Sequence, residues 1–163
     1  MPWTLVLNTI STFALVGAVV FAAIEFRSSK SDREKSAAIE LVRTMQDGAW
    51  EGSVLVIAAL PSPGTPHLDA LQERAAAAVG IRLETLGYQV FIGVVPLTLV
   101  DDLVGGIARL AWSRLSPWVV LGRDATGNSK SYEWFEWLAE RLYELPGTSE
   151  PAYLLYSDWK PIK

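Results

Sequence analysis

Residues 3–24 read WTLVLNTISTFALVGAVVFAAI and contain no charged side chain. A helix of 22 residues is about 33 Å long, and about 20 apolar residues suffice to cross a bilayer. The run is longer than the apolar region of a signal peptide, and no Lys or Arg precedes it. We therefore expect residues 1–26 to form a transmembrane anchor; a cleaved signal peptide and a buried soluble helix are the alternatives.

The charges that follow this run predict its orientation. Four basic residues come directly after it: Arg27, Lys30, Arg33 and Lys35. Loops rich in Lys and Arg stay on the cytoplasmic side of a membrane. We expect a bacterial inner-membrane protein with its N-terminus outside and residues 27–163 in the cytoplasm. The absence of cysteine is compatible with that reducing compartment.

Small residues recur on one face of the expected membrane helix. They are Ala14, Gly17, Ala18 and Ala22. Small side chains allow another helix to approach closely in a membrane, although Ala and Gly are also simply common there. The spacing favours a partner helix, which belongs either to another copy or to a different protein.

The rest of the chain has the pattern of an all-α protein. Apolar residues recur at steps of three or four over residues 38–45, 71–94 and 97–111, without the alternation typical of strands. We expect a cytoplasmic bundle of about four to five helices over residues 27–145. An irregular, aromatic-containing tail, residues 146–163, should pack onto the bundle or onto a partner.

Several local signals refine the expected bundle. Asp47 and Gly48 should end the first cytoplasmic helix, and the apolar helix over residues 50–60 should be buried. A loop with three prolines (61–66) separates these helices from the rest. Pro96 should begin a helix that breaks or kinks at Pro117, with a turn over 122–127. Ser129 or Ser131 should cap the last helix. We expect close packing or a bend at Gly87, and tight contact with a neighbour at Gly105 and Gly106.

Two stretches carry a resemblance to known proteins: VPLTLVDDLVGGIARLAWSRLSPWV (95–119) and TGNSKSYEWFEWLAERL (126–142). With the membrane run, SAAIELVR (36–43) and LETLGY (83–88), they make most of the chain resemble uncharacterised single-pass bacterial membrane proteins grouped as a domain of unknown function. The resemblance implies an N-terminal anchor and a small cytoplasmic helical domain. It implies no activity.

The residues that carry most enzyme chemistry are scarce. The net charge is −4, which gives no basic field for nucleic acid, and the chain has one histidine and no cysteine. Asp101 and Asp102 are adjacent, so they point in different directions on a helix. Glu133, Glu136 and Glu140 favour a solvated acidic face, and His67 favours a surface loop. We expect no enzyme activity, no metal and no cofactor.

Aromatic residues are instead abundant. Of seven tryptophans, we expect Trp50 and Trp112 inside. Trp, Tyr and Arg are enriched at the energetic centres of protein interfaces. The expected partner contacts lie on the last helix and in the tail: Trp134, Trp137, Arg141, Tyr153, Tyr156 and Trp159. The face of residues 107–121 that carries Leu115 suits either an interfacial membrane helix or, as we favour, a helix facing the core.

These features favour a membrane-anchored, non-catalytic interaction protein, an accessory subunit of a larger respiratory, photosynthetic or transport complex. Its expected partners are membrane lipid and other membrane subunits or itself, and not nucleic acid. A self-associating scaffold or sensor is one alternative. A small membrane-tethered enzyme is another.

Overall fold

The computed structural model describes residues 36–43, 47–145 and 152–161. Every regular element in these ranges is helical, which confirms the all-α class. Among the residues described, no helix combines the length and the hydropathy needed to span a membrane. The predicted anchor, residues 1–26, lies outside the described ranges, and with it the predicted packing residues Ala14, Gly17, Ala18 and Ala22. The orientation residues Arg27, Lys30, Arg33 and Lys35 lie outside them as well.

The chain divides into two compact units, with the boundary between Leu41 and Val42. Residues 36–43 are helical, as expected for this part of the chain. The next helix, α2 (Gly48–Ala58), begins at Asp47, whose carboxylate accepts a hydrogen bond of 3.0 Å from the amide of Ala49. Asp47 therefore caps the start of a helix.

Only one face of α2 is buried. Trp50 and Ile57 lie in the core, whereas Leu55 is 65% exposed. The prediction that this helix is buried is therefore correct for the inner face and wrong for the outer one. Burial of Trp50 confirms its predicted place inside.

The longest helix, α3 (Ala70–Phe91), has well-defined ends. Asp69 and Gln72 form a reciprocal capping box at its start. At its end, the amide of Val94 donates to the carbonyl of Gln89 and the amide of Gly93 donates to that of Val90. Gly93 has φ +75°, so this is a Schellman motif with glycine in the left-handed conformation. The apolar stripe predicted to reach Val94 therefore ends before it.

The segment after Pro96 is helical but not uniform. It comprises α4 (Leu97–Val100), a π-helical turn η1 (Asp101–Gly105) and α5 (Gly106–Thr126). Of the two alternatives predicted at Pro117, the break is wrong, because α5 continues through that residue, and the kink stays a prediction. The predicted turn over 122–127 is also wrong except at Gly127, which ends α5 with φ +66°. A proline removes one amide from a helix, and the surrounding packing here outweighs that loss.

The last helix of the bundle, α6 (Glu133–Glu144), starts later than expected. Its N-cap residue is Tyr132, in the left-handed conformation, and neither Ser129 nor Ser131 caps it. Beyond the bundle, α7 (Ala152–Leu155) forms within the tail predicted to be irregular.

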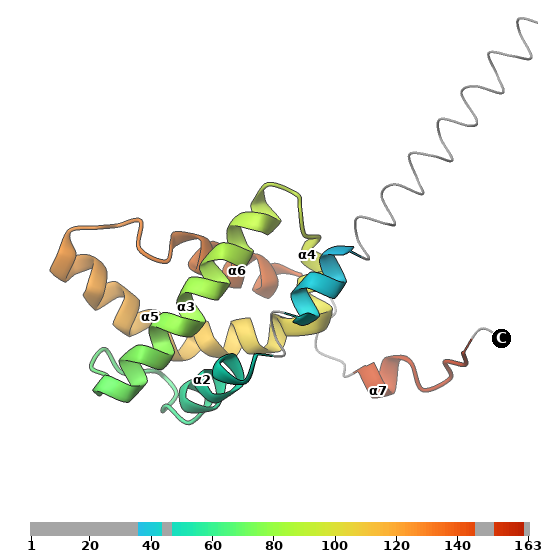
Figure 1. Ribbon diagram of the computed structural model, residues 1–163, viewed down its shortest axis with the longest axis horizontal. Helices are drawn as coiled ribbons and strands as arrows, with labels where there is room; N and C mark the ends of the chain where they lie inside the picture. Colours follow the sequence, from blue (N-terminus) through green and yellow to red (C-terminus); the bar gives the residue numbers. More distant parts are fainter. Residues whose placement is uncertain (1–35, 44–46, 146–151, 162–163) are drawn as a thin grey trace, which may run out of the picture. The chain divides into compact units, whose positions relative to one another are not determined.

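Four helices, α2, α3, α5 and α6, build the bundle, which Figure 1 shows in ribbon form. α3 packs most extensively against α6 and next against α2, and α5 packs against α6 and α2. The largest fully buried side chains come from all four helices and from α4: Phe135, Ile57, Leu83, Leu115, Leu138, Leu142, Val79 and Val100. Leu115 and its neighbours Ala111 and Val119 on the same face of α5 are buried. Of the two alternatives predicted for this face, contact with a membrane or with the core, the structure therefore shows the core.

Candidate functional site

Large aromatic side chains gather where the end of α3 meets the start of α6. Trp134 lies in contact with Tyr88, with ring centroids 5.5 Å apart, and with Phe91 at 4.5 Å. Trp137 contacts Phe91 at 5.8 Å and Trp134 at 6.1 Å. We call these four residues, Tyr88, Phe91, Trp134 and Trp137, the α3–α6 aromatic surface.

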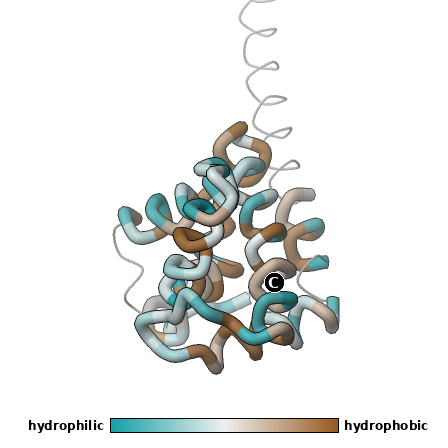
Figure 2. The backbone as a smooth tube through the Cα atoms, turned by 90° about the vertical axis from the view of Figure 1, so that its left-hand side faces the viewer, coloured by the Kyte–Doolittle hydropathy of each residue, from teal (hydrophilic) through white to brown (hydrophobic). Residues whose placement is uncertain are grey.

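This cluster is a surface and not a core. Phe91 is 55% exposed and Tyr88 47%, while the two tryptophans are half-buried. The Schellman turn extends the apolar area with Ile92 and Val94, which are 49% and 56% exposed. In Figure 2 the upper end of α3 and the turn beyond it carry hydrophobic colour. Contiguous exposed apolar patches on soluble domains typically mark interaction sites.

Two glycines of α3 bring α6 close enough to form this surface. A Cβ on Gly87 would collide with the backbone carbonyl of Trp134, and one on Gly80 would lie 2.6 Å from the Tyr132 ring. The two residues are seven apart, so they lie on the same side of α3. Gly87 confirms the expected close packing, since backbone meets backbone there.

A side chain of α3 also caps α6. The carboxylate of Glu84 accepts a hydrogen bond of 2.8 Å from the amide of Phe135. The first amides of a helix have no partner within the helix, so an acceptor there stabilises its start. Burial raises the pKa of Glu84, and the hydrogen bonds from the amides of Phe135 and Trp134 oppose that effect. Burial, together with the charge of Glu84, also raises the pKa of Tyr132.

Arginines of α5 fix both ends of α6. Arg123 pairs with Glu136 at 2.6 Å and donates to the carbonyl of Ser131 at 2.8 Å. Arg109 pairs with Asp101 at 2.7 Å and donates to the carbonyl of Leu142 at 3.3 Å. These pairs are part-buried, so solvent screens them less than it screens exposed pairs.

Arg114 completes the set, because its guanidinium donates to the carbonyl of Leu60 at 2.5 Å. A membrane-facing role for α5 would need Arg109 and Arg114 at lipid headgroups. Both instead make contacts within the bundle. The space at Gly105 is limited from within its own turn, because a Cβ there would lie 2.5 Å from the carboxylate of Asp101, the first residue of η1. Gly106 has open space above it. The predicted tight contact of these two glycines with a neighbouring helix is therefore wrong.

The six residues predicted to contact a partner separate into three groups. Trp134 and Trp137 belong to the α3–α6 aromatic surface. Arg141 pairs with Glu144 at 2.9 Å and Glu140 at 3.5 Å along the surface of α6. The tail residues Tyr153, Tyr156 and Trp159 are 64–76% exposed.

Sequence reasoning missed Tyr88 and Phe91, which supply half of the aromatic surface. Both follow Gly87, the one residue of this region whose close packing was expected. A glycine at a helix contact next to two aromatic residues was therefore the available signal.

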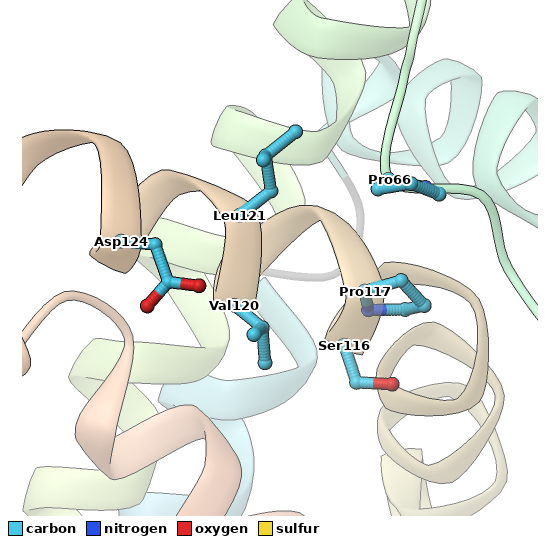
Figure 3. A pocket seen from close by; sticks show the side chains of 6 residues that line it. All are labelled: Pro66, Ser116, Pro117, Val120, Leu121 and Asp124. Atoms are coloured by element: carbon cyan, nitrogen blue, oxygen red, sulfur yellow. The ribbon is translucent and has the colours of Figure 1, made fainter.

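A second feature is a shallow hollow of about 500 Å³ on the other side of α5 from its core face. Figure 3 shows that Ser116, Pro117, Val120, Leu121 and Asp124 line it from α5, and Pro66 from the loop after α2. The lining is mainly apolar and Asp124 is its one charged residue. It lacks the convergent polar groups that orient a small ligand.

The residues considered for chemistry do not converge. In the described ranges, no three carboxylate, histidine or cysteine residues are grouped so that they could hold a metal ion. Glu136 and Glu140 pair with Arg123 and Arg141, and His67 lies exposed in the proline loop. Asp101 serves the ion pair with Arg109, and Asp102 is exposed.

No family model, no curated protein and no solved structure matches this chain. Its function must therefore be inferred from its own residues. The α3–α6 aromatic surface groups exposed aromatic side chains that the packing of the bundle does not require.

Proposed function

We propose that this protein is a membrane-anchored, non-catalytic interaction protein, an accessory subunit of a larger membrane complex. The observation that carries the proposal is the α3–α6 aromatic surface. Phe91 is more than half exposed although two tryptophans flank it, and the turn beyond it adds exposed Ile92 and Val94. Tryptophan and tyrosine are enriched among the few residues that carry most of the binding energy of protein interfaces, which supports a protein partner.

The construction of the surface supports a binding role as well. Backbone contact at Gly87, the Glu84 cap and the Arg123 pair hold α3 and α6 in a fixed relation. A rigid surface loses little conformational entropy on binding, so more of the contact energy appears as affinity. The uncharged run over residues 3–24 supports the membrane location.

Extraction of the full chain in a gentle detergent, followed by size analysis and mass spectrometry, tests the proposal. We expect the chain to migrate with a constant set of other membrane proteins. A discrete oligomer of this chain alone would favour the self-associating scaffold instead, and a lone monomer would contradict both. External protease on intact cells should spare residues 27–163, and their digestion would overturn the proposed orientation.

Two matched variants test whether the aromatic surface makes the contact. Phe91→Glu places a charge in the surface, while Leu71→Glu does the same at the opposite end of α3, where Leu71 is 66% exposed. We expect Phe91→Glu to lose the partner proteins and Leu71→Glu to keep them. Equal retention of the partners by both variants would exclude the aromatic surface as the contact.

A further inference from the structure

The C-terminal tail carries a second exposed aromatic face. Tyr153, Tyr156 and Trp159 recur every three residues and are 76%, 64% and 67% exposed. The amide of Tyr156 donates to the carbonyl of Ala152, and that of Trp159 donates to the carbonyl of Tyr156. Helical turns of this kind place residues three apart on the same side. We call residues 152–159 the aromatic segment.

The aromatic segment lies within reach of the α3–α6 aromatic surface. α6 ends at Glu144, and from Trp137 to Leu145 a helix rises about 12 Å. Residues 146–151 connect this end to α7, and six residues span up to about 20 Å. The tether is therefore long enough for the chain to turn back along α6 to Trp137 and Phe91.

We propose that the aromatic segment of this chain is a ligand of its own α3–α6 aromatic surface. Both faces expose large aromatic side chains of the same chemistry, and each would cover the other. At the edges of the two faces, Lys160 follows Trp159 and can meet Glu133, which adjoins Trp134, while Asp158 on the other side of Trp159 is exposed and can stay in solvent.

Tethering favours this occupant over a second copy. A short connection gives an effective concentration of about 1 mM, so a segment whose intrinsic dissociation constant lies below that value is docked most of the time. A second copy at micromolar concentration has no such advantage. The docking itself is independent of the proposed function. Its consequence rests on the proposed function: a partner of the surface must displace the segment, which makes the segment a competitor for the partner site.

Cross-linking of the isolated full chain in detergent tests the docking. The natural sequence has no cysteine, so a cross-linker reacts only with the thiols that the substitutions introduce. In Ile92→Cys/Ser157→Cys, a short bismaleimide should join the two positions within one chain. The matched control, Leu71→Cys/Ser157→Cys, places the first thiol at the far end of α3, about 31 Å from residue 92, and should give little product. Mainly intermolecular products, or equal yields in the two variants, would overturn the proposal.

Thiol labelling provides a second measurement that needs no second cysteine. Ile92→Cys should react at least about twofold faster with a maleimide when Tyr156→Ala and Trp159→Ala are added, as expected for loss of a segment that is docked most of the time. The rate at Leu71→Cys should not change with the same two substitutions. An unchanged rate at Ile92→Cys would contradict the docking even if the partner proteins of the complex were found as proposed. Conversely, a failure to find such partners would leave the labelling result unaffected.

Discussion

The same two helices, α3 and α6, build two regions of opposite character. Along their contact, Leu83, Leu86, Phe135 and Leu138 are at most 4% exposed, and a Cβ on Gly87 would collide with α6. At one end, the α3–α6 aromatic surface leaves Phe91 and Tyr88 about half exposed. Burial on this scale stabilises a fold, whereas a half-exposed ring contributes less to it. The difference separates residues that hold the bundle together from residues that are available to bind.

A comparison of two phenylalanines tests most strongly whether buried residues stabilise the bundle more than residues of the aromatic surface do. Phe135 is fully buried against Trp112, at a centroid distance of 5.1 Å, whereas Phe91 is 55% exposed. Phe135→Ala should lower the free energy of unfolding by about 3–5 kcal/mol. Phe91→Ala should lower it by about 1 kcal/mol or less, because it leaves no enclosed cavity. Urea unfolding followed by circular dichroism measures both, and similar losses would contradict the distinction.

The second largest effect concerns the glycine contact. Gly87→Ala forces the backbone of α6 away from α3, and overpacking of this kind costs about 1–3 kcal/mol. Gly52→Ala in α2 is a matched control, because its Cβ would meet nothing within 4 Å. The control should stabilise the protein by about 0.5–1 kcal/mol, since alanine favours a helix over glycine. If the two variants shift the unfolding midpoint in the same direction, the contact at Gly87 is not close.

The third effect concerns Glu84 and the start of α6. Glu84→Ala removes the acceptor of the Phe135 amide, whereas Glu84→Gln keeps an oxygen in its place. The alanine variant should be less stable than the glutamine variant at pH 7, by about 1 kcal/mol, the usual value of a helix cap. Equal stabilities would show that the cap contributes nothing.

The pH dependence of the same residue has a definite sign. Burial raises the pKa of Glu84 in the folded protein above its ordinary value of 4.5, so the folded state binds more protons than the unfolded state above that pH. The contribution of Glu84 to stability is therefore largest below pH 4.5 and falls as the pH rises through the folded pKa. Glu84→Gln should remove this contribution, and the difference between the two unfolding curves across pH 4 to 7 measures it.

The last effect on stability concerns the turn that ends α3 beside the aromatic surface. Gly93 has φ +75°, and an L-residue in this conformation costs about 1 kcal/mol. Gly93→Ala should therefore destabilise the protein by about that amount, and Gly93→Asn by less. Thermal unfolding distinguishes the two variants. A stabilising Gly93→Ala substitution would exclude the left-handed turn.

The helices of this bundle follow largely from local sequence patterns. The buried stripe of α3, with Ala75, Val79, Leu83 and Leu86, repeats at helical spacing, so its burial could be predicted. The course of α5 past Pro117 could not, because packing against α6 and α2 overrides a local breaking signal. The cap of α6 by Glu84 could not be predicted either. Glu84 and Phe135, which form its hydrogen bond, are 51 residues apart, and no local motif joins them.

The candidate surface shows the same division. Trp134 and Trp137 were predicted because they share a helix face with Arg141. Tyr88 and Phe91 were not, since only the approach of α6 to Gly87 makes them neighbours of those tryptophans. Arg141 itself pairs with glutamates of its own helix. A face on one helix can therefore be predicted from spacing, whereas a surface shared by two helices requires their packing.

The most direct test of the central claim measures stability and binding in one variant, Phe91→Glu. We predict that its free energy of unfolding stays within about 1 kcal/mol of the natural protein, as is usual for surface substitutions. We also predict that the partner proteins no longer migrate with it after gentle detergent extraction. Unfolding of the bundle by this substitution would show that the aromatic surface is part of the core. An intact complex would show that the surface does not bind the partner.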